Sequence, residues 1–378
     1  QTLDDVFGIQ NLISEQVVSA LRLELLGQLP TADEIDPRAY DLYLQARHIV
    51  HTTSSPDQFE TAREKLNQVV EIEPEFVPGL FELARVHLRF WGPDADAAEV
   101  ASIKRNIQAL VDRMYEIAPM SNYAQGFKGF IAQYWDGDYE RSAFHRERAL
   151  EAAANSNTLL QLDRTGAFVA ELGRYEEALA ISEYVISRDP ACTPCLDTYA
   201  HLMQRLGRAT EAAERLEEIF EWQIPAGYQL VVLGRAWLRA GEFENALSYF
   251  DRVSDQNEVY EYRLVALLGI GQQTEFEEGF AALREAYPTA FPVIAGLYGH
   301  SGQNDLAFEA LEKWMAVRGP EPINLDDNVD FQSLKSDPRW GPFIEKYDLG
   351  RKDFSHIQFN PKYPPEIEAA LAELQVRD

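Results

Sequence analysis

Apolar residues recur at spacings of three and four along most of this chain, and alternation at a spacing of two is nearly absent. This period is typical of amphipathic α-helices, which bury one face and expose the other. Glycines interrupt the pattern at intervals of roughly 34 residues, which is the period of a helix–turn–helix repeat. The series comprises Gly137, Gly173, Gly207, Gly241, Gly271 and Gly302. The pattern therefore predicts an all-α repeat protein.

Each strong repeat combines a small residue, a turn glycine, an alanine and a closing proline. In the repeat around Gly173, these places are filled by Gly166, Gly173, Ala178 and Pro190. The small residue allows the second helix to approach closely, and the turn glycine can adopt the left-handed conformation that ends a helix. Proline cannot continue a helix, so it separates one repeat from the next.

The repeats resemble the tetratricopeptide repeat, whose pattern is W-x2-L-G-x2-Y, then A-x3-F, then P. The best match in this chain is Leu230, Leu233, Gly234, Trp237, Ala246 and Phe250. The resemblance implies a right-handed α-solenoid of about eight helix pairs, in which the first helix of each pair lines a concave face. The match is closest from Gly173 to Gly241 and weaker toward both ends.

We expect three segments: a linker helix at residues 1–29 that is the tail of a preceding domain, a superhelix at 30–320, and a C-terminal cap with a final helix at 321–378. A longer turn is expected around Trp91–Asp94. The chain starts without methionine at Gln1, so we expect it to be part of a longer protein.

The C-terminal segment after Trp340 is polar and irregular before a final helix from Glu366 to Val376. Its apolar residues Phe354, Ile357 and Phe359 are expected to hold it against the last repeat helix, because a terminal repeat needs a cap over its exposed apolar face. The alternative is a swapped contact with a second chain, which would give a homodimer.

Both flanks resemble one bacterial group. The segments Leu3–Gln10, Ala39–His48 and Leu334–Trp340 are similar to those of membrane-anchored winged-helix transcriptional regulators and of class III adenylate cyclases that carry tetratricopeptide repeats. The resemblance implies that a DNA-binding or cyclase domain precedes Gln1. It also implies that the repeats lie on the periplasmic side of the inner membrane; the alternative is a cytoplasmic location.

The chain is strongly acidic, with 34 Lys and Arg against 62 Asp and Glu, which gives a net charge of −28. Such a surface repels phosphate backbones and anionic headgroups, so direct nucleic-acid contact by this segment is not expected. No apolar run reaches the roughly 18 residues of a membrane span, so membrane insertion is not expected either. Solubility or a salty habitat would account for the same charge.

The two cysteines, Cys192 and Cys195, lie at the junction between two repeats. Three interpretations stay open. A local disulfide suits an oxidising compartment, and a free pair suits the cytosol. A metal site would need two more ligands, and His201 gives a spacing that is not standard for zinc. A thioredoxin-like redox pair is not expected, because that motif needs a βαβ setting.

No motif for catalysis is present. The sequence lacks a zinc H-E-x-x-H, a phosphate-binding loop and a dinucleotide fingerprint. Gly299–Gln303 comes near a nucleophile elbow, but the second glycine and the preceding strand are missing. His48 and His51 share a helical face without a third ligand. We therefore expect no enzyme, no cofactor and no metal.

The inward places of the first helices are rich in arginine and aromatic residues. The predicted partner-binding residues are Phe81, Arg85, Arg89, Phe127, Phe130, Tyr134, His201, Gln204, Arg205, Arg235 and Arg239. Arginine forks suit carboxylates, and arginine with aromatics is the composition of binding hot spots. The hypothesis is a locally basic groove for an acidic peptide. The alternative is that these arginines pair with carboxylates of adjacent helices and are structural.

The favoured function is a protein-interaction or sensory module of a larger bacterial signalling or transcription regulator, with a protein or peptide partner in its concave groove. One alternative is a free-standing cytosolic adaptor. The other is the regulatory part of an adenylate cyclase whose catalytic domain lies outside this chain.

Overall fold

A computed structural model describes residues 35–375 except 53–55, 91–96, 154–157, 222–224, 226, 318–324, 326–328 and 351. The predicted linker helix at 1–29 and the turn at 91–94 lie outside the described residues. Every regular element within the described residues is a helix.

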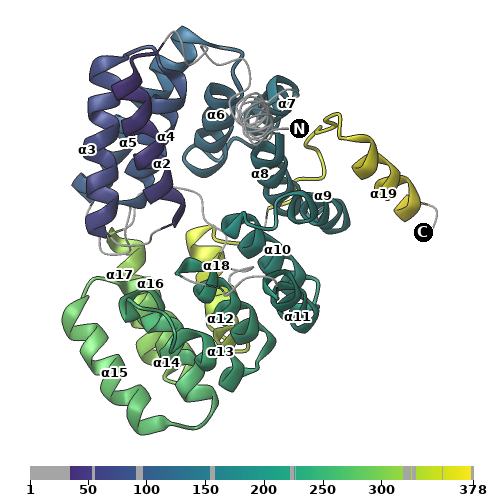
Figure 1. Ribbon diagram of the computed structural model, residues 1–378. Helices are drawn as coiled ribbons and strands as arrows, with labels where there is room; N and C mark the ends of the chain where they lie inside the picture. The colour runs from purple at the N-terminus through teal and green to yellow at the C-terminus, as the bar shows by residue number, and fades with distance from the viewer. Residues whose placement is uncertain are drawn as a thin grey trace, which may run out of the picture.

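Sixteen of these helices form eight successive packed pairs. The pairs are α2 (Pro37–Thr52) with α3 (Pro56–Ile72), α4 (Val77–Arg89) with α5 (Ala97–Ile117), α6 (Asn122–Tyr134) with α7 (Tyr139–Ala152), α8 (Thr158–Glu171) with α9 (Tyr175–Arg188), α10 (Thr193–Arg205) with α11 (Ala209–Phe220), α12 (Tyr228–Ala240) with α13 (Phe243–Phe250), α14 (Tyr260–Gly269) with α15 (Gln273–Ala286), and α16 (Phe291–His300) with α17 (Asn304–Val317). The array curls in an arc (Figure 1). The chain therefore has the tetratricopeptide solenoid architecture that its sequence predicts.

The turn glycines end the first helices, as the pattern predicts. All six have φ between 65° and 84°, a region that only glycine enters without strain. Gly241 follows α12 directly as its left-handed cap, and its N–H donates to Leu238 O at 3.1 Å. These turns set the antiparallel return of each second helix.

The core runs along the array as a series of overlapping apolar clusters. Counted from the N-terminus, the first and second clusters share the helix α4, and the third and fourth clusters share the helix α14. Phe250 of α13 belongs to the third cluster and Phe276 of α15 to the fourth, and both side chains are fully buried. This stacking is how a repeat that cannot bury its own apolar face becomes stable.

The end of the array is capped by a short helical segment. The 3-10 helix η3 (Val329–Leu334) and the helix α18 (Trp340–Tyr347) bury Phe331, Trp340 and Phe343 against the last repeat. Phe343 meets Phe308 of α17 edge-to-face, with ring centroids 5.8 Å apart. This segment thus covers apolar side chains of the last repeat.

The segment beyond α18 does not stay on the last repeat, so that expectation is wrong for Phe354, Ile357 and Phe359. These residues pack instead with the cluster that spans α7 to α14, where Phe354 stacks on Tyr139 at a centroid distance of 3.8 Å. The chain runs from α18 back to the middle of the array and ends in α19 (Pro365–Gln375) beside α9 (Figure 1). The physical reason is that Ile357 and Phe359 join the apolar cluster to which the buried Phe168 of α8 belongs.

Candidate functional site

A cavity of about 710 Å³ lies between the first helices of repeats four to eight. We call it the groove pocket. Its lining comes mainly from α8, α10, α12, α14 and α16, because the first helix of each pair faces inward. The residues are Glu171, His201, Gln204, Arg205, Arg235, Leu238, Arg239, Phe243, Tyr262, Val265, Leu268, Gly269, His300 and Asp330. The volume lies in the usual range for ligand sites.

The predicted residues of repeats five and six all line this pocket: His201, Gln204, Arg205, Arg235 and Arg239. They occupy successive inward turns of α10 and α12. Since these two helices are neighbours in the array, the repeat pattern alone was enough to bring the five side chains together.

The three pocket arginines are also held by carboxylates of the preceding first helix. Arg235 Nη1 lies 3.0 Å from Asp197 Oδ2, and Arg239 Nη1 lies 3.1 Å from Asp197 Oδ1. Arg205 Nη1 lies 3.3 Å from Glu171 Oε1. The carboxylate pairing of the structural alternative is therefore present, and it involves the same arginines that line the cavity.

Burial and charge set the protonation states here. Burial alone would raise the pKa of Asp197, but Arg235 and Arg239 together hold that pKa below its ordinary value. Burial lowers the pKa of His201 to about 4, with further lowering from Arg239 and Arg205. At neutral pH the pocket thus presents charged guanidinium groups and a neutral imidazole.

Aromatic and apolar side chains complete the pocket walls. The Arg235 guanidinium lies 5.0 Å from the ring centroid of Tyr262, and Leu238 and Val265 line the same cavity. The carboxamide oxygen of Gln204 is buried and has no hydrogen-bond partner within the described residues. The site therefore combines cationic donors, the carboxylates of Glu171 and Asp330, one unmatched acceptor and an apolar wall.

Several lining residues were not predicted. Tyr262 and His300 lie at inward places of α14 and α16, so extending the same reading to repeats seven and eight would have found them. Burial lowers the pKa of His300. Asp330 comes from η3, which carries no repeat signature, and no sequence signal points to it.

The predicted residues of repeats two and three form a different environment. Phe81 and Phe127 are only 1% and 2% exposed and pack against each other in the core, so the structure does not present their side chains to a partner. An error of one residue in helical register turns a side chain by about 100°, enough to move it from the groove to the core.

Of the other predicted residues of this half, Tyr134 and Arg89 are exposed, whereas Phe130 and Arg85 are half-buried. Tyr134 is 43% exposed and lies 4.9 Å from the Phe130 ring. Arg85 pairs with Glu82 at 3.1 Å, while Arg89 is exposed over the ring of Phe59. None of the four lines the groove pocket.

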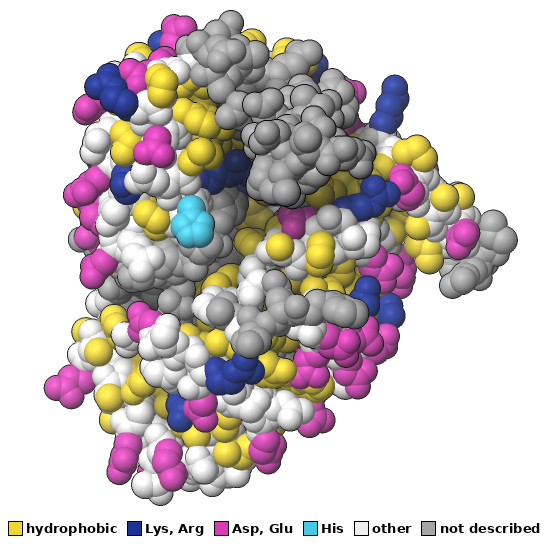
Figure 2. Space-filling model, in the orientation of Figure 1, with side chains coloured by type: hydrophobic (Ala, Val, Ile, Leu, Met, Phe, Trp, Pro, Cys, Tyr) yellow, Lys and Arg dark blue, Asp and Glu magenta, His cyan; other side chains and the backbone are white. Residues whose placement is uncertain are grey.

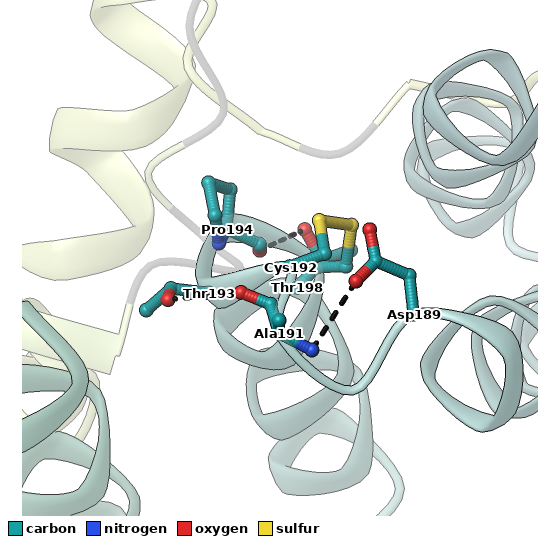
Figure 3. The surroundings of a disulfide bond; sticks show 7 residues. Asp189, Ala191, Cys192, Thr193, Pro194 and Thr198 are labelled. Carbon is teal, nitrogen blue, oxygen red and sulfur yellow. Dashed lines mark hydrogen bonds between the residues drawn. A yellow bond between two sulfur atoms is a disulfide. The ribbon is translucent and has the colours of Figure 1, made fainter. Parts of the chain in front are cut away.

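Cys192 and Cys195 form a disulfide at the start of α10. Figure 3 shows it in a hydrogen-bonded turn: Ala191 N–H donates to Asp189 Oδ1, and the Thr198 hydroxyl donates to Pro194 O. Among the three interpretations of this pair, the structure contains the local disulfide. It fixes the first turn of a helix whose next turns carry Asp197 and His201.

Within the described residues, no cluster of three or more His, Cys, Asp or Glu side chains has the arrangement of a metal site. Among the helices described there, none is both long enough and apolar enough to cross a membrane.

Acidic side chains gather over α11 on the outer surface (Figure 2), where Glu211, Glu214 and Glu218 are located.

No protein-family model matches this chain. Among curated proteins it is 32% identical over 76 residues to a protein provisionally named adenylate cyclase 3 of Rhizobium meliloti (strain 1021). The match takes in 19% of this chain and 13% of that protein, so the chain spans only a small part of the relative's length.

Several solved helical structures are similar at low identity. PilW, described as a widely conserved type IV pilus biogenesis factor, is 12% identical with a TM-score of 0.39 over 57% of this chain and 92% of that one. A human IFIT1 dimer with m7Gppp-AAAA is 13% identical with a TM-score of 0.46, over 74% and 72%. A tetratricopeptide repeat protein from Parabacteroides merdae is 16% identical with a TM-score of 0.36, over 62% and 100%. None of these likenesses assigns a ligand to this chain.

Proposed function

We propose that this chain is the partner-binding, sensory module of a larger bacterial signalling or transcription regulator. Its groove pocket binds an acidic, carboxylate-bearing segment of a protein or peptide partner. The observation that carries the proposal is the gathering of Arg205, Arg235 and Arg239 around one cavity in a chain whose net charge is −28.

The pairing with carboxylates leaves donors for such a partner. Arg235 and Arg239 share the single carboxylate of Asp197, and each guanidinium has five N–H donors. One negative charge therefore offsets only one of the two positive charges, and the remaining donors are already held in place when a partner binds. The acidic outer surface repels the same partner elsewhere, which favours the pocket over other sites.

Binding of a fluorescein-labelled peptide of alternating Glu and Leu, followed by fluorescence anisotropy, tests the proposal. Replacing Arg239 by Gln removes a charge-assisted hydrogen bond worth about 1.5–3 kcal/mol, so affinity should fall at least tenfold. Arg215→Gln is the matched control, because Arg215 lies 51% exposed on the outer helix α11 and pairs with Glu218. Its affinity should match that of the parent protein.

Asp197→Asn separates binding from a purely structural role. A partner carboxylate bound by both arginines would lie about 7 Å from the carboxylate of Asp197. At that distance, removing the negative charge of Asp197 is worth about 1 kcal/mol of binding free energy at an effective dielectric of about 40. Affinity should therefore rise about fivefold, more at low salt than at high salt. Equal weakening by Arg239→Gln and Asp197→Asn would show that the arginines serve only the fold.

A second reading, the regulatory part of an adenylate cyclase, is favoured by the 76-residue similarity to the Rhizobium meliloti protein. The sequence upstream of Gln1 distinguishes a cyclase domain from a winged-helix domain, and an adaptor would have neither.

We place the module on the periplasmic side of the inner membrane, supported by the disulfide. Thiol alkylation of protein extracted without reductant tests that location, since cytosolic protein would react at Cys192 and Cys195.

A further inference from the structure

The C-terminal segment 352–375, which we call the C-terminal strap, bridges repeats that are far apart in the chain. Its apolar anchors are Ile357, Phe359 and Ile367, which are at most 8% exposed. Phe359 meets Phe168 of α8 edge-to-face at a centroid distance of 5.1 Å. The strap thus adds its own residues to the core of the middle repeats.

Polar contacts fix the strap in register on α7 to α9. Arg174 Nη1 donates to the Phe359 carbonyl oxygen at 2.7 Å, and the Asn360 N–H donates to Glu147 Oε1 at 2.8 Å. The Tyr363 hydroxyl donates to Glu177 Oε1 at 2.7 Å. Arg188 pairs with Glu366 at 2.7 Å, although both side chains are about half exposed. Contacts with four separate side chains of α7, α9 and the turn before α9 thus hold the strap in one specific position.

The other end of the strap is attached to the cap of the last repeat. Immediately before it, the Leu349 carbonyl accepts a hydrogen bond from Leu325 N–H at 2.9 Å, and Leu349 is fully buried in the cap. The groove pocket begins at Glu171 of α8 and ends at Asp330 of η3. The strap therefore connects the two ends of the array that encloses the pocket (Figure 1).

In a solenoid each repeat contacts its neighbours, so curvature is the sum of small rotations and is easily changed. A link between distant repeats removes that freedom. We propose that the C-terminal strap is a releasable clasp that fixes the curvature of repeats four to eight and thereby the width of the groove pocket. Release of the strap lets these repeats open while each repeat stays folded.

The composition of the strap suits release. Lys352, Asp353, Ser355 and His356 precede the buried anchors and are exposed, so the apolar contacts of the strap are confined to Phe354 and to separate residues from Ile357 onward. Segments with few buried contacts open locally at lower free energy than the core. The cap formed by α18 stays on the last repeat when the strap leaves, because its contacts are with α16, α17 and η3.

A spin-label distance between the two ends tests the clasp without any ligand, so its result is independent of the proposed partner. Exposed Glu183 on α9 and Glu309 on α17 are replaced by cysteine and labelled without reductant, which leaves the native disulfide intact. In Phe354→Ala/Phe359→Ala, the distance distribution should shift to longer values and broaden. Hydrogen exchange at 354–367 should rise in the same variant.

The matched control is Phe144→Ala, since Phe144 lies on α7 but is 49% exposed and stacks with Arg148 rather than with the strap. Its distance distribution should equal that of the parent protein. If the double variant fails to fold, Arg174→Gln/Tyr363→Phe removes polar contacts of the strap and leaves its apolar anchors. An unchanged distance despite faster exchange of the strap would overturn the proposal. A parent dimer with exchanged straps would overturn it as well.

Discussion

Gly234 gives the sharpest test of how the helix pairs are held together. A methyl group at this position of α12 would lie 2.3 Å from Phe250 Cε1 and 2.5 Å from Phe250 Cδ1. Phe250 is completely buried on α13, so its ring cannot move away into solvent. Gly234→Ala therefore forces the two helices apart or drives the ring from its rotamer.

The homologous position in repeat four is an internal control. At Gly166 the nearest atom to an added methyl group is Ile181 Cγ2 at 3.3 Å, which a small adjustment accommodates. Alanine gains about 1 kcal/mol over glycine within a helix, whereas overpacking a core costs about 1–3 kcal/mol. We expect Gly234→Ala to lose up to about 2 kcal/mol, and Gly166→Ala to be neutral or to gain up to about 1 kcal/mol.

Urea unfolding followed by far-ultraviolet circular dichroism compares the variants through their midpoints. Because solenoids unfold repeat by repeat, hydrogen exchange in α12 and α13 gives the local effect. Gly234→Ala/Phe250→Leu should recover part of the loss, since a smaller side chain leaves room for the methyl group. Equal midpoints for Gly234→Ala and Gly166→Ala would refute the close-approach argument.

Three other predictions follow from buried polar groups. The pKa of His201 is about 4 in the folded protein and 6.5 in the unfolded chain, so protonation of the unfolded chain should lower the free energy of unfolding by on the order of 3 kcal/mol as pH falls from 6.5 to 4, with full stability above 6.5. Burial raises the pKa of Asp163 to about 6, which changes the free energy of unfolding in the opposite direction. The contribution of His201 is therefore measured as the difference between the parent protein and His201→Gln. Arg146→Met should cost about 2–4 kcal/mol in urea unfolding, because Gln133 Oε1 and the Arg164 carbonyl lose their donor, and a neutral result would contradict this assignment. Removing the disulfide as Cys192→Ala/Cys195→Ala should cost about 2 kcal/mol, since its loop is short, and a loss above about 4 kcal/mol would mean that α10 itself unfolds.

The repeat period predicts most of the architecture because it reflects local rules. Turn glycines such as Gly173 and Gly302 announce the helix ends, and both adopt positive φ. The groove residues of α10 and α12 follow from the same rule, because helices in neighbouring repeats repeat their orientation. What the period encodes is the relation of each repeat to its neighbours.

The repeat period does not predict the position of the strap or the burial of Arg146. Phe354 and Phe359 are apolar residues in an irregular segment, and nothing local distinguishes a contact with α17 from one with α8. Arg146 is 6% exposed, although an arginine on a second helix is ordinarily expected at the surface. Its place depends on Ser142, whose hydroxyl lies 3.1 Å from Arg146 Nε, and on Gln133 across the helix pair. The strap depends on contacts between distant parts of the chain, and Arg146 depends on hydrogen bonds within its own helix pair and to the next one.

The structural and the binding roles of the pocket arginines support each other. A guanidinium that is 9% exposed, as in Arg239, would lose much of its hydration without a carboxylate nearby, and Asp197 supplies it. The same bond fixes the direction of the remaining donors, which lowers the entropy lost when an anion binds. Arg205 is neutralised by its own carboxylate, Glu171, whereas Arg235 and Arg239 divide Asp197, and Asp330 of the pocket lining acts on Arg235 as a further charge. The sharing of Asp197 is thus the feature that keeps a buried pair stable and still basic, and Asp197→Asn should expose its cost in stability and its gain in affinity together.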